Sequence, residues 1–158
     1  MENLNQVDIL IIEDDLHDAE VVIRALRRSN PLSNIHFVME GSEALDNILC
    51  RGKFKKRTEE ISPKFVLLDL KLSKVTRLEI LKTLKSDKRF CHIPVITIIS
   101  SKEAHDIREA YSLGANSCIV KPISNDLFEF QLSRIGNYWL HVNEAPCQEQ
   151  EVFDYFFE

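Results

Sequence analysis

The run FVLLD at residues 65–69 decides the fold. Its four large apolar residues follow one another without alternation, a pattern typical of a strand buried on both faces of a parallel sheet. The run ends in Asp69, and an earlier apolar run, ILII at residues 9–12, ends in Glu13 and Asp14. In open α/β sheets, ligands bind in the crevice beyond the carboxyl ends of the strands. If the two strands are neighbours, three acids therefore meet at one rim.

Strand and helix patterns alternate five times around this run. The strand patterns cover residues 7–12, 35–39, 65–69, 94–99 and 117–120, and the helical patterns cover residues 15–28, 42–49, 76–86, 103–113 and 125–140. Each helical pattern has apolar residues three and four apart, which gives one buried stripe. Ser42 is the expected N-cap of the second helix, and Gly114 the expected C-cap of the fourth. The order predicts an α/β fold, a doubly wound five-stranded parallel sheet with helices on both faces.

The length of 158 residues suits one domain with a single core. We expect that domain at residues 1–142, followed by an acidic tail at residues 143–158 that contains four aromatic residues. The charge of the tail favours disorder. Its rings favour docking on the domain or on a second protomer.

The net charge of −5 argues against broad nucleic-acid binding, which requires a basic face. The four cysteines lie far apart and have no metal-ligand spacing, which favours reduced thiols over zinc or a disulfide framework. The N-terminus lacks the basic and apolar regions of a signal peptide, and no apolar stretch reaches transmembrane length. We therefore expect a cytoplasmic protein that binds neither nucleic acid nor membrane.

Ionisable groups stand where three predicted strands end: Glu13 and Asp14 after the first, Asp69 after the third and Lys121 after the fifth. Clustered carboxylates raise one another's pKa unless a cation lies among them. Mg²⁺ prefers oxygen ligands and removes that repulsion. Such a site suits phosphoryl transfer, with Asp69 as the nucleophile. Glu13 and Asp14 would hold the metal, and Lys121 would bind the phosphoryl oxygens.

Each of these residues also has a simpler interpretation. An acid directly after a buried strand is often a helix N-cap, and Asp14 or Asp15 can cap the helix that follows. A single lysine before a proline, such as Lys121, is usually solvated. The combination of charge signs at three strand ends favours the functional interpretation.

These residues resemble the receiver domains of two-component response regulators. The residues that carry the resemblance are Glu13-Asp14, Asp69 and Lys121-Pro122. The similarity spans residues 7–138 and implies the flavodoxin-like strand order 2-1-3-4-5, which makes the first and third strands neighbours. The long loop at residues 50–62 and the segment at 138–146 are similar to the small stand-alone regulators of cyanobacterial phytochromes.

The resemblance implies a function as well as a fold. A histidine kinase would transfer a phosphoryl group to Asp69, and the similarity to the phytochrome regulators favours a kinase of the phytochrome type. Mg²⁺ would be bound by Asp14, Asp69, a backbone carbonyl near Lys71 and water, with Glu13 helping. The surface at residues 103–139 would then switch, and a homodimer would form there through the fourth and fifth helices, helped by Phe128, Tyr138, Trp139 and the aromatic tail.

The chain departs from the family pattern at the residues of that switch. An ungapped alignment places Ile99 where the family has Thr or Ser, and Cys118 where it has Tyr or Phe. Ile99 has no hydroxyl group, and Ser100 and Ser101 are displaced along the strand, on which adjacent side chains point to opposite faces.

The loop after Asp69 departs as well. Ser73 replaces a usual Pro, and Thr76-Arg77 replaces a usual Asp-Gly. If that glycine has a positive φ, Arg77 is either strained or part of a remodelled turn.

The leading hypothesis is a phosphate-accepting signalling protein that acts through protein contacts and is no enzyme beyond self-phosphorylation and self-dephosphorylation at Asp69. The alternative is a degenerate receiver that interacts constitutively, without phosphorylation. An aspartyl phosphatase would need a second Asp two residues after Asp69, where this chain has Lys71. Flavin or nucleotide binding is disfavoured because the four glycines form no phosphate loop.

Overall fold

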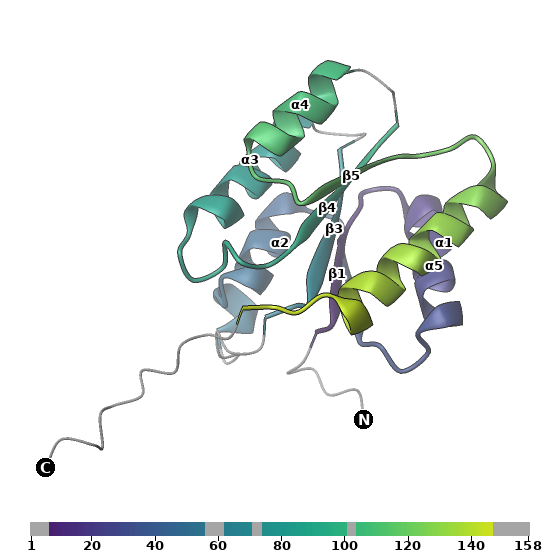
Figure 1. The fold of residues 1–158 in the computed structure, drawn as a ribbon. Coiled ribbons are helices and arrows are strands. Elements are labelled where there is room, and N and C mark those ends of the chain that lie inside the picture. The colour runs from purple at the N-terminus through teal and green to yellow at the C-terminus, as the bar shows by residue number, and fades with distance from the viewer. Residues whose placement is uncertain (1–6, 56–61, 71–73, 101–103, 147–158) are drawn as a thin grey trace, which may run out of the picture.

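A computed structural model describes residues 7–55, 62–70, 74–100 and 104–146 (Figure 1). Five strands form one parallel sheet in the order β2-β1-β3-β4-β5. The strands are β1 (Ile9–Ile12), β2 (Ile35–Val38), β3 (Phe65–Asp69), β4 (Val95–Ile99) and β5 (Ser117–Val120). This confirms the predicted fold, including the neighbouring positions of the first and third strands.

Helices cover both faces of the sheet, as predicted (Figure 1). One face carries α1 (Leu16–Ser29) and α5 (Asn125–Asn137), which pack against each other. The other face carries α2 (Gly41–Ile48), α3 (Lys74–Ser86) and α4 (Ala104–Ser112). A short 3-10 turn, η1 (Gly52–Phe54), follows α2, and a π-helical turn, η2 (Tyr138–Val142), follows α5.

The apolar runs of the strands belong to two cores, one on each face. Along β3, Val66 and Leu68 join the core under α2, α3 and α4. Phe65 and Leu67 join the core under α1 and α5. Because successive residues of a strand point to opposite faces, a strand covered on both sides needs an apolar residue at every position.

The helix ends agree in part with the predictions. Asp15 is the N-cap of α1 and accepts a hydrogen bond from the Asp18 backbone N–H at 2.9 Å. Gly114 follows α4 with a φ of +102°, as expected of a C-terminal cap. The prediction that Ser42 caps the second helix is wrong, because α2 begins one residue earlier, at Gly41.

Gly41, the first residue of α2, lies against α3. A Cβ atom at this position would lie 2.8 Å from Ile80 Cδ1, so the end of that side chain would have to shift. The residue before it, Glu40, makes no side-chain capping hydrogen bond.

Two predictions about the chain ends have different outcomes. The last helix was expected to run to residue 140, but α5 ends at Asn137 and continues as the π-helical turn η2. The tail after residue 146 lies outside the described residues. Among the residues described, no helix combines the length and the apolar character needed to cross a membrane.

Candidate functional site

Three carboxylates meet where β1 and β3 end. The two strands pair in register, with Ile12 opposite Leu68, so the next residues, Glu13 and Asp69, lie side by side. Carboxylate oxygens of Glu13, Asp69 and Asp18 lie within 4.8 Å of one another, and we call these three residues the acidic cluster. Glu13 and Asp69 are buried, with only 3% and 5% of their surfaces exposed.

The carboxyl group of Glu13 is neutral in this arrangement. Burial, followed by the hydrogen bond to Asp69 and the negative charge of that residue, raises the pKa of Glu13 to about 9. The backbone N–H of Asp15, which donates to Glu13 Oε1 at 3.0 Å, opposes this shift. At neutral pH Glu13 therefore holds a proton and shares a hydrogen bond with Asp69.

Lys121 approaches the cluster from the end of β5. Its Nζ lies 2.8 Å from Asp18 Oδ1, in an ion pair between groups 103 residues apart in the sequence. The ammonium also lies 5.5 Å from the centre of the Phe128 ring. Lys121 is thus poised beside the cluster, and it pairs with Asp18, a residue whose part in the site the sequence analysis missed.

Asp14 points to a different partner. Its Oδ1 lies 3.8 Å from Arg77 Nη2, and the carboxylate does not belong to the acidic cluster. Arg77 is a residue of α3, and its side chain is 3% exposed. Cys50 is the only non-glycine residue with a positive φ in the described ranges, so Arg77 adopts ordinary helical backbone within α3.

The acidic cluster suits a small divalent cation. Three carboxylates at this spacing offer the oxygen ligands that Mg²⁺ prefers, and a cation would relieve the repulsion that burial intensifies. Glu13 and Asp69 are two of the expected ligands, and Asp18 would be an additional one. Glu13 would release its proton when the ion binds. Lys71, whose carbonyl was expected to complete the site, lies outside the described residues.

The predicted switch positions lie on or directly after β4 and β5, with Ile99 the last residue of β4 and Cys118 near the start of β5. Ile99 is buried in the core under α3 and α4, and Ser100 is exposed directly after it. Cys118, on β5, is partly buried, and its backbone N–H donates to the Tyr111 hydroxyl at 3.3 Å. Ser101 lies outside the described residues.

A hydroxyl group is nevertheless present within β4. Thr97 is fully buried, and its hydroxyl donates to Cys118 Sγ at 2.9 Å and approaches the Ser117 carbonyl at 3.3 Å. Thr97 faces Cys118 in the strand register. The run PVITII at residues 94–99 predicted only a buried strand. A single threonine inside such a run does not indicate which group its hydroxyl contacts.

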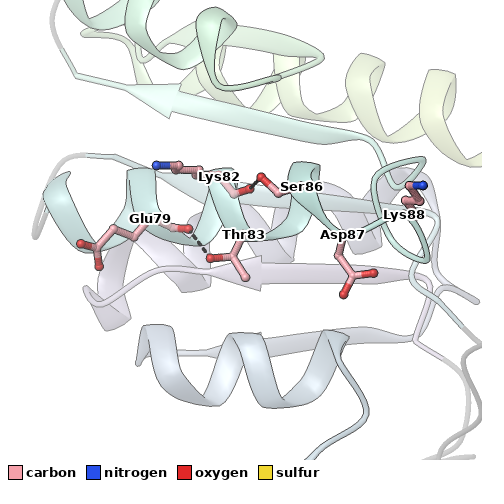
Figure 2. A pocket seen from close by; sticks show the side chains of 6 residues that line it. All are labelled: Glu79, Lys82, Thr83, Ser86, Asp87 and Lys88. Atoms are coloured by element: carbon pink, nitrogen blue, oxygen red, sulfur yellow. Dashed lines mark hydrogen bonds between the residues drawn. The ribbon is translucent and has the colours of Figure 1, made fainter.

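A hollow elsewhere on the surface has no connection with these acids. It has a volume of about 750 Å³ and follows the C-terminal half of α3 and the next turn (Figure 2). The residues that line it are Glu79, Lys82, Thr83, Ser86, Asp87 and Lys88. With two acids and two lysines, it favours neither sign of charged ligand.

The sheet order and the strand-end acids define a class of protein, the doubly wound α/β domains with an acidic site at the carboxyl edge of the sheet. Within this class, the chain belongs to the response regulator receiver domains, whose family model matches residues 9–130. This confirms the family that the sequence resembles. Receiver domains are signalling modules.

Relatives place the chain near the phytochrome regulators. A probable methanogenesis regulatory protein, FilR2 of Methanothrix harundinacea, is 33% identical over 87% of this chain and 86% of that protein. The phosphorylated cyanobacterial phytochrome response regulator RcpA matches with a TM-score of 0.80 and 28% identity, over 89% of this chain and 99% of that chain. The bacteriophytochrome response regulator AtBRR matches with a TM-score of 0.69 and 35% identity, over 91% and 99%.

Proposed function

We propose that this protein is a cytoplasmic response regulator that accepts a phosphoryl group on Asp69 from a histidine kinase. The observation that carries the proposal is the position of Asp69, which lies at the carboxyl end of the central strand within the acidic cluster. Lys121 stands beside this cluster through its ion pair with Asp18. The names of the phytochrome regulators support a kinase of the phytochrome type.

Each residue of the site has a separate role in the phosphoryl transfer. An Asp69 carboxylate oxygen forms a bond to phosphorus while the bond from phosphorus to the kinase histidine nitrogen breaks. The imidazole that leaves takes a proton from solvent. Glu13 shares a hydrogen bond with Asp69 and so orients the carboxylate that attacks. Lys121 moves from Asp18 to the phosphoryl oxygens, since those carry the greater negative charge.

A divalent ion completes this site. Asp69 and Glu13 would hold Mg²⁺ with Asp18 in reach, and the resemblance adds Asp14 and the Lys71 carbonyl. When bound, Mg²⁺ supplies positive charge that neutralises the carboxylates and the phosphoryl oxygens.

The signal would leave through the surface formed by α4, β5 and α5, where we also place a homodimer contact. This surface carries exposed Tyr111, Leu127 and Phe130, which are 50%, 46% and 57% exposed. Two of the rings that were expected to assist a dimer are not freely exposed for such a contact. Phe128 is buried in the core beside α1, and Trp139 is partly buried against the same core.

Intact mass spectrometry after incubation with acetyl phosphate and Mg²⁺ tests the proposal. The wild type should gain the mass of one phosphoryl group, and Asp69→Asn should gain none. Asp46→Asn, which removes a half-exposed acid of α2, is the matched control and should behave as the wild type. A wild type without any mass gain would contradict the proposal.

The alternative function is a receiver that binds its partners constitutively. The observations that favour it are the buried Ile99 and the Cys118 that accepts a hydrogen bond from Thr97, because neither offers the hydroxyl and aromatic groups of the family's switch. In that case, light scattering would give the same oligomeric state with and without acetyl phosphate. A change of oligomeric state that Asp69→Asn abolishes would exclude this alternative.

A further inference from the structure

Arg77 is a buried cation beside the site, at a position where the resemblance predicts glycine. Its side chain is 3% exposed. One terminal nitrogen, Nη2, lies 3.8 Å from Asp14 Oδ1 and donates to the Met39 carbonyl at 3.5 Å. The other, Nη1, is buried without a hydrogen-bond partner among the described residues.

A guanidinium group in this environment needs a compensating charge. An arginine that loses its water is costly unless an acid pairs with it. Asp14 is the acid within ion-pair distance of Arg77, and its side chain is 28% exposed. The ion pair with Asp14 and the hydrogen bond to the Met39 carbonyl are both near the upper distance limit for such contacts. Charge attraction and burial therefore hold the guanidinium more than hydrogen bonding does.

The charges around the site therefore sort into three groups. Lys121 pairs with Asp18, and Arg77 pairs with Asp14. Glu13 and Asp69 lie at the centre and are joined by a hydrogen bond. Asp14 follows Glu13 directly in the sequence, yet it is turned to a cation of the protein and lies outside the acidic cluster.

We propose that Arg77 is a positioning residue that withdraws Asp14 from the cation site, so that a divalent ion binds this chain through Glu13, Asp18 and Asp69. This inference rests on the proposed function only for the presence of a divalent-cation site. A fixed positive charge beside that site also repels the incoming ion. Arg77 thus weakens divalent binding twice, by holding a ligand away and by its own charge.

The test measures the dissociation constant of Mn²⁺ from the full chain, by the electron paramagnetic resonance signal of free Mn²⁺. Arg77→Gln removes the charge and keeps much of the side chain, and it should bind Mn²⁺ about tenfold more tightly than the wild type. Asp14→Asn in the wild-type background should change the constant by less than about threefold. In the Arg77→Gln background, the same Asp14→Asn change should abolish most of the gain.

The matched control is Arg27→Gln, which removes an exposed arginine of α1 and changes the net charge equally. It should leave the dissociation constant at the wild-type value. An unchanged constant in Arg77→Gln, or a gain that persists in the double variant, overturns the inference.

A separate outcome covers a variant that does not fold. If circular dichroism shows that Arg77→Gln is unfolded, Asp14→Asn alone decides, because a loss of affinity of tenfold or more would show that Asp14 is a ligand despite Arg77. The proposed function is judged independently, by phosphorylation of Asp69. If Asp69 is not phosphorylated, the Mn²⁺ dissociation constants can still be interpreted. If the Mn²⁺ prediction fails, the result for phosphorylation of Asp69 still stands.

Discussion

The paired strands β1 and β3 and the paired strands β4 and β5 belong to one sheet, but they differ in chemistry. The carboxyl ends of β1 and β3 carry Glu13 and Asp69, which are buried together beside Asp18. Strand β4 ends in Ile99, buried in the core, and Cys118, near the start of β5, accepts a hydrogen bond from Thr97. The first region matches the family pattern, and the second departs from it at Ile99 and Cys118.

On the proposed function, the difference implies that receiving a phosphoryl group and responding to it are separable properties. Reception depends on charges at adjacent strand ends, which the parallel pairing of β1 with β3 brings together. The response depends on a hydroxyl and a ring that can exchange positions. In this chain the hydroxyl of Thr97 is inside the sheet, with partners of its own.

The largest expected effect concerns Lys121. Lys121→Gln removes the cation that faces the phosphoryl oxygens and should slow phosphorylation by acetyl phosphate about 100-fold. The rate of mass gain measures it. Lys82→Gln, which removes an exposed lysine of α3, is the control and should keep the wild-type rate. Equal rates in both variants would show that Lys121 serves only its ion pair with Asp18.

The second prediction concerns Glu13 and pH. The folded pKa of Glu13, about 9, lies above its ordinary value of 4.5, so the folded state retains a proton that the unfolded state releases. The contribution of Glu13 to the free energy of unfolding is fully present below pH 4.5 and is lost as the pH rises to 9. Between pH 6 and 8, the free energy of unfolding in EDTA should fall by about 2 to 3 kcal/mol.

Urea unfolding at several pH values checks this second prediction. Glu13→Gln cannot release the proton, so its stability should be nearly flat over the same range. Added Mg²⁺ should reduce the slope of the wild type, because the ion stabilises the charged carboxylates. Parallel slopes in the wild type and Glu13→Gln would assign the pH dependence to other groups.

The third prediction tests whether the end of β4 accommodates a hydroxyl. Ile99→Thr places one in the core under α3 and α4, where it should cost about 2 to 3 kcal/mol of stability. Ile99→Val, which shortens the side chain without adding polarity, should cost about 1 kcal/mol. Equal losses in urea unfolding would mean that a polar partner is available and that the two regions differ less than we infer.

The smallest expected effect concerns Thr97. Thr97→Val keeps the shape and removes the hydrogen bonds to Cys118 and Ser117, at a cost of about 1 kcal/mol. Thr83→Val is the matched control, since the Thr83 hydroxyl donates to the Glu79 carbonyl on an exposed face. It should cost less than about 0.5 kcal/mol in the same measurement. A neutral Thr97→Val would show that the buried hydroxyl contributes little to the pairing of β4 with β5.

The family pattern in the sequence predicted the strand order and, through it, the meeting of Glu13 with Asp69. Five apolar runs separated by helical stripes leave few arrangements, because the three central runs must be buried on both faces. The helix ends were less predictable. Ser42 has the chemistry of a cap, but α2 begins at Gly41 and Glu40 occupies the cap position.

The sequence by itself determined the sheet, the helices on both its faces and the edge where acids gather, because burial imposes a pattern that the chain displays locally. Only the tertiary structure decided which charges pair. Lys121 contacts Asp18 and Arg77 contacts Asp14, across large separations in the sequence. A long charged side chain pairs with whichever opposite charge lies near it after the helices have packed. The spacing of residues in the sequence does not indicate that distance.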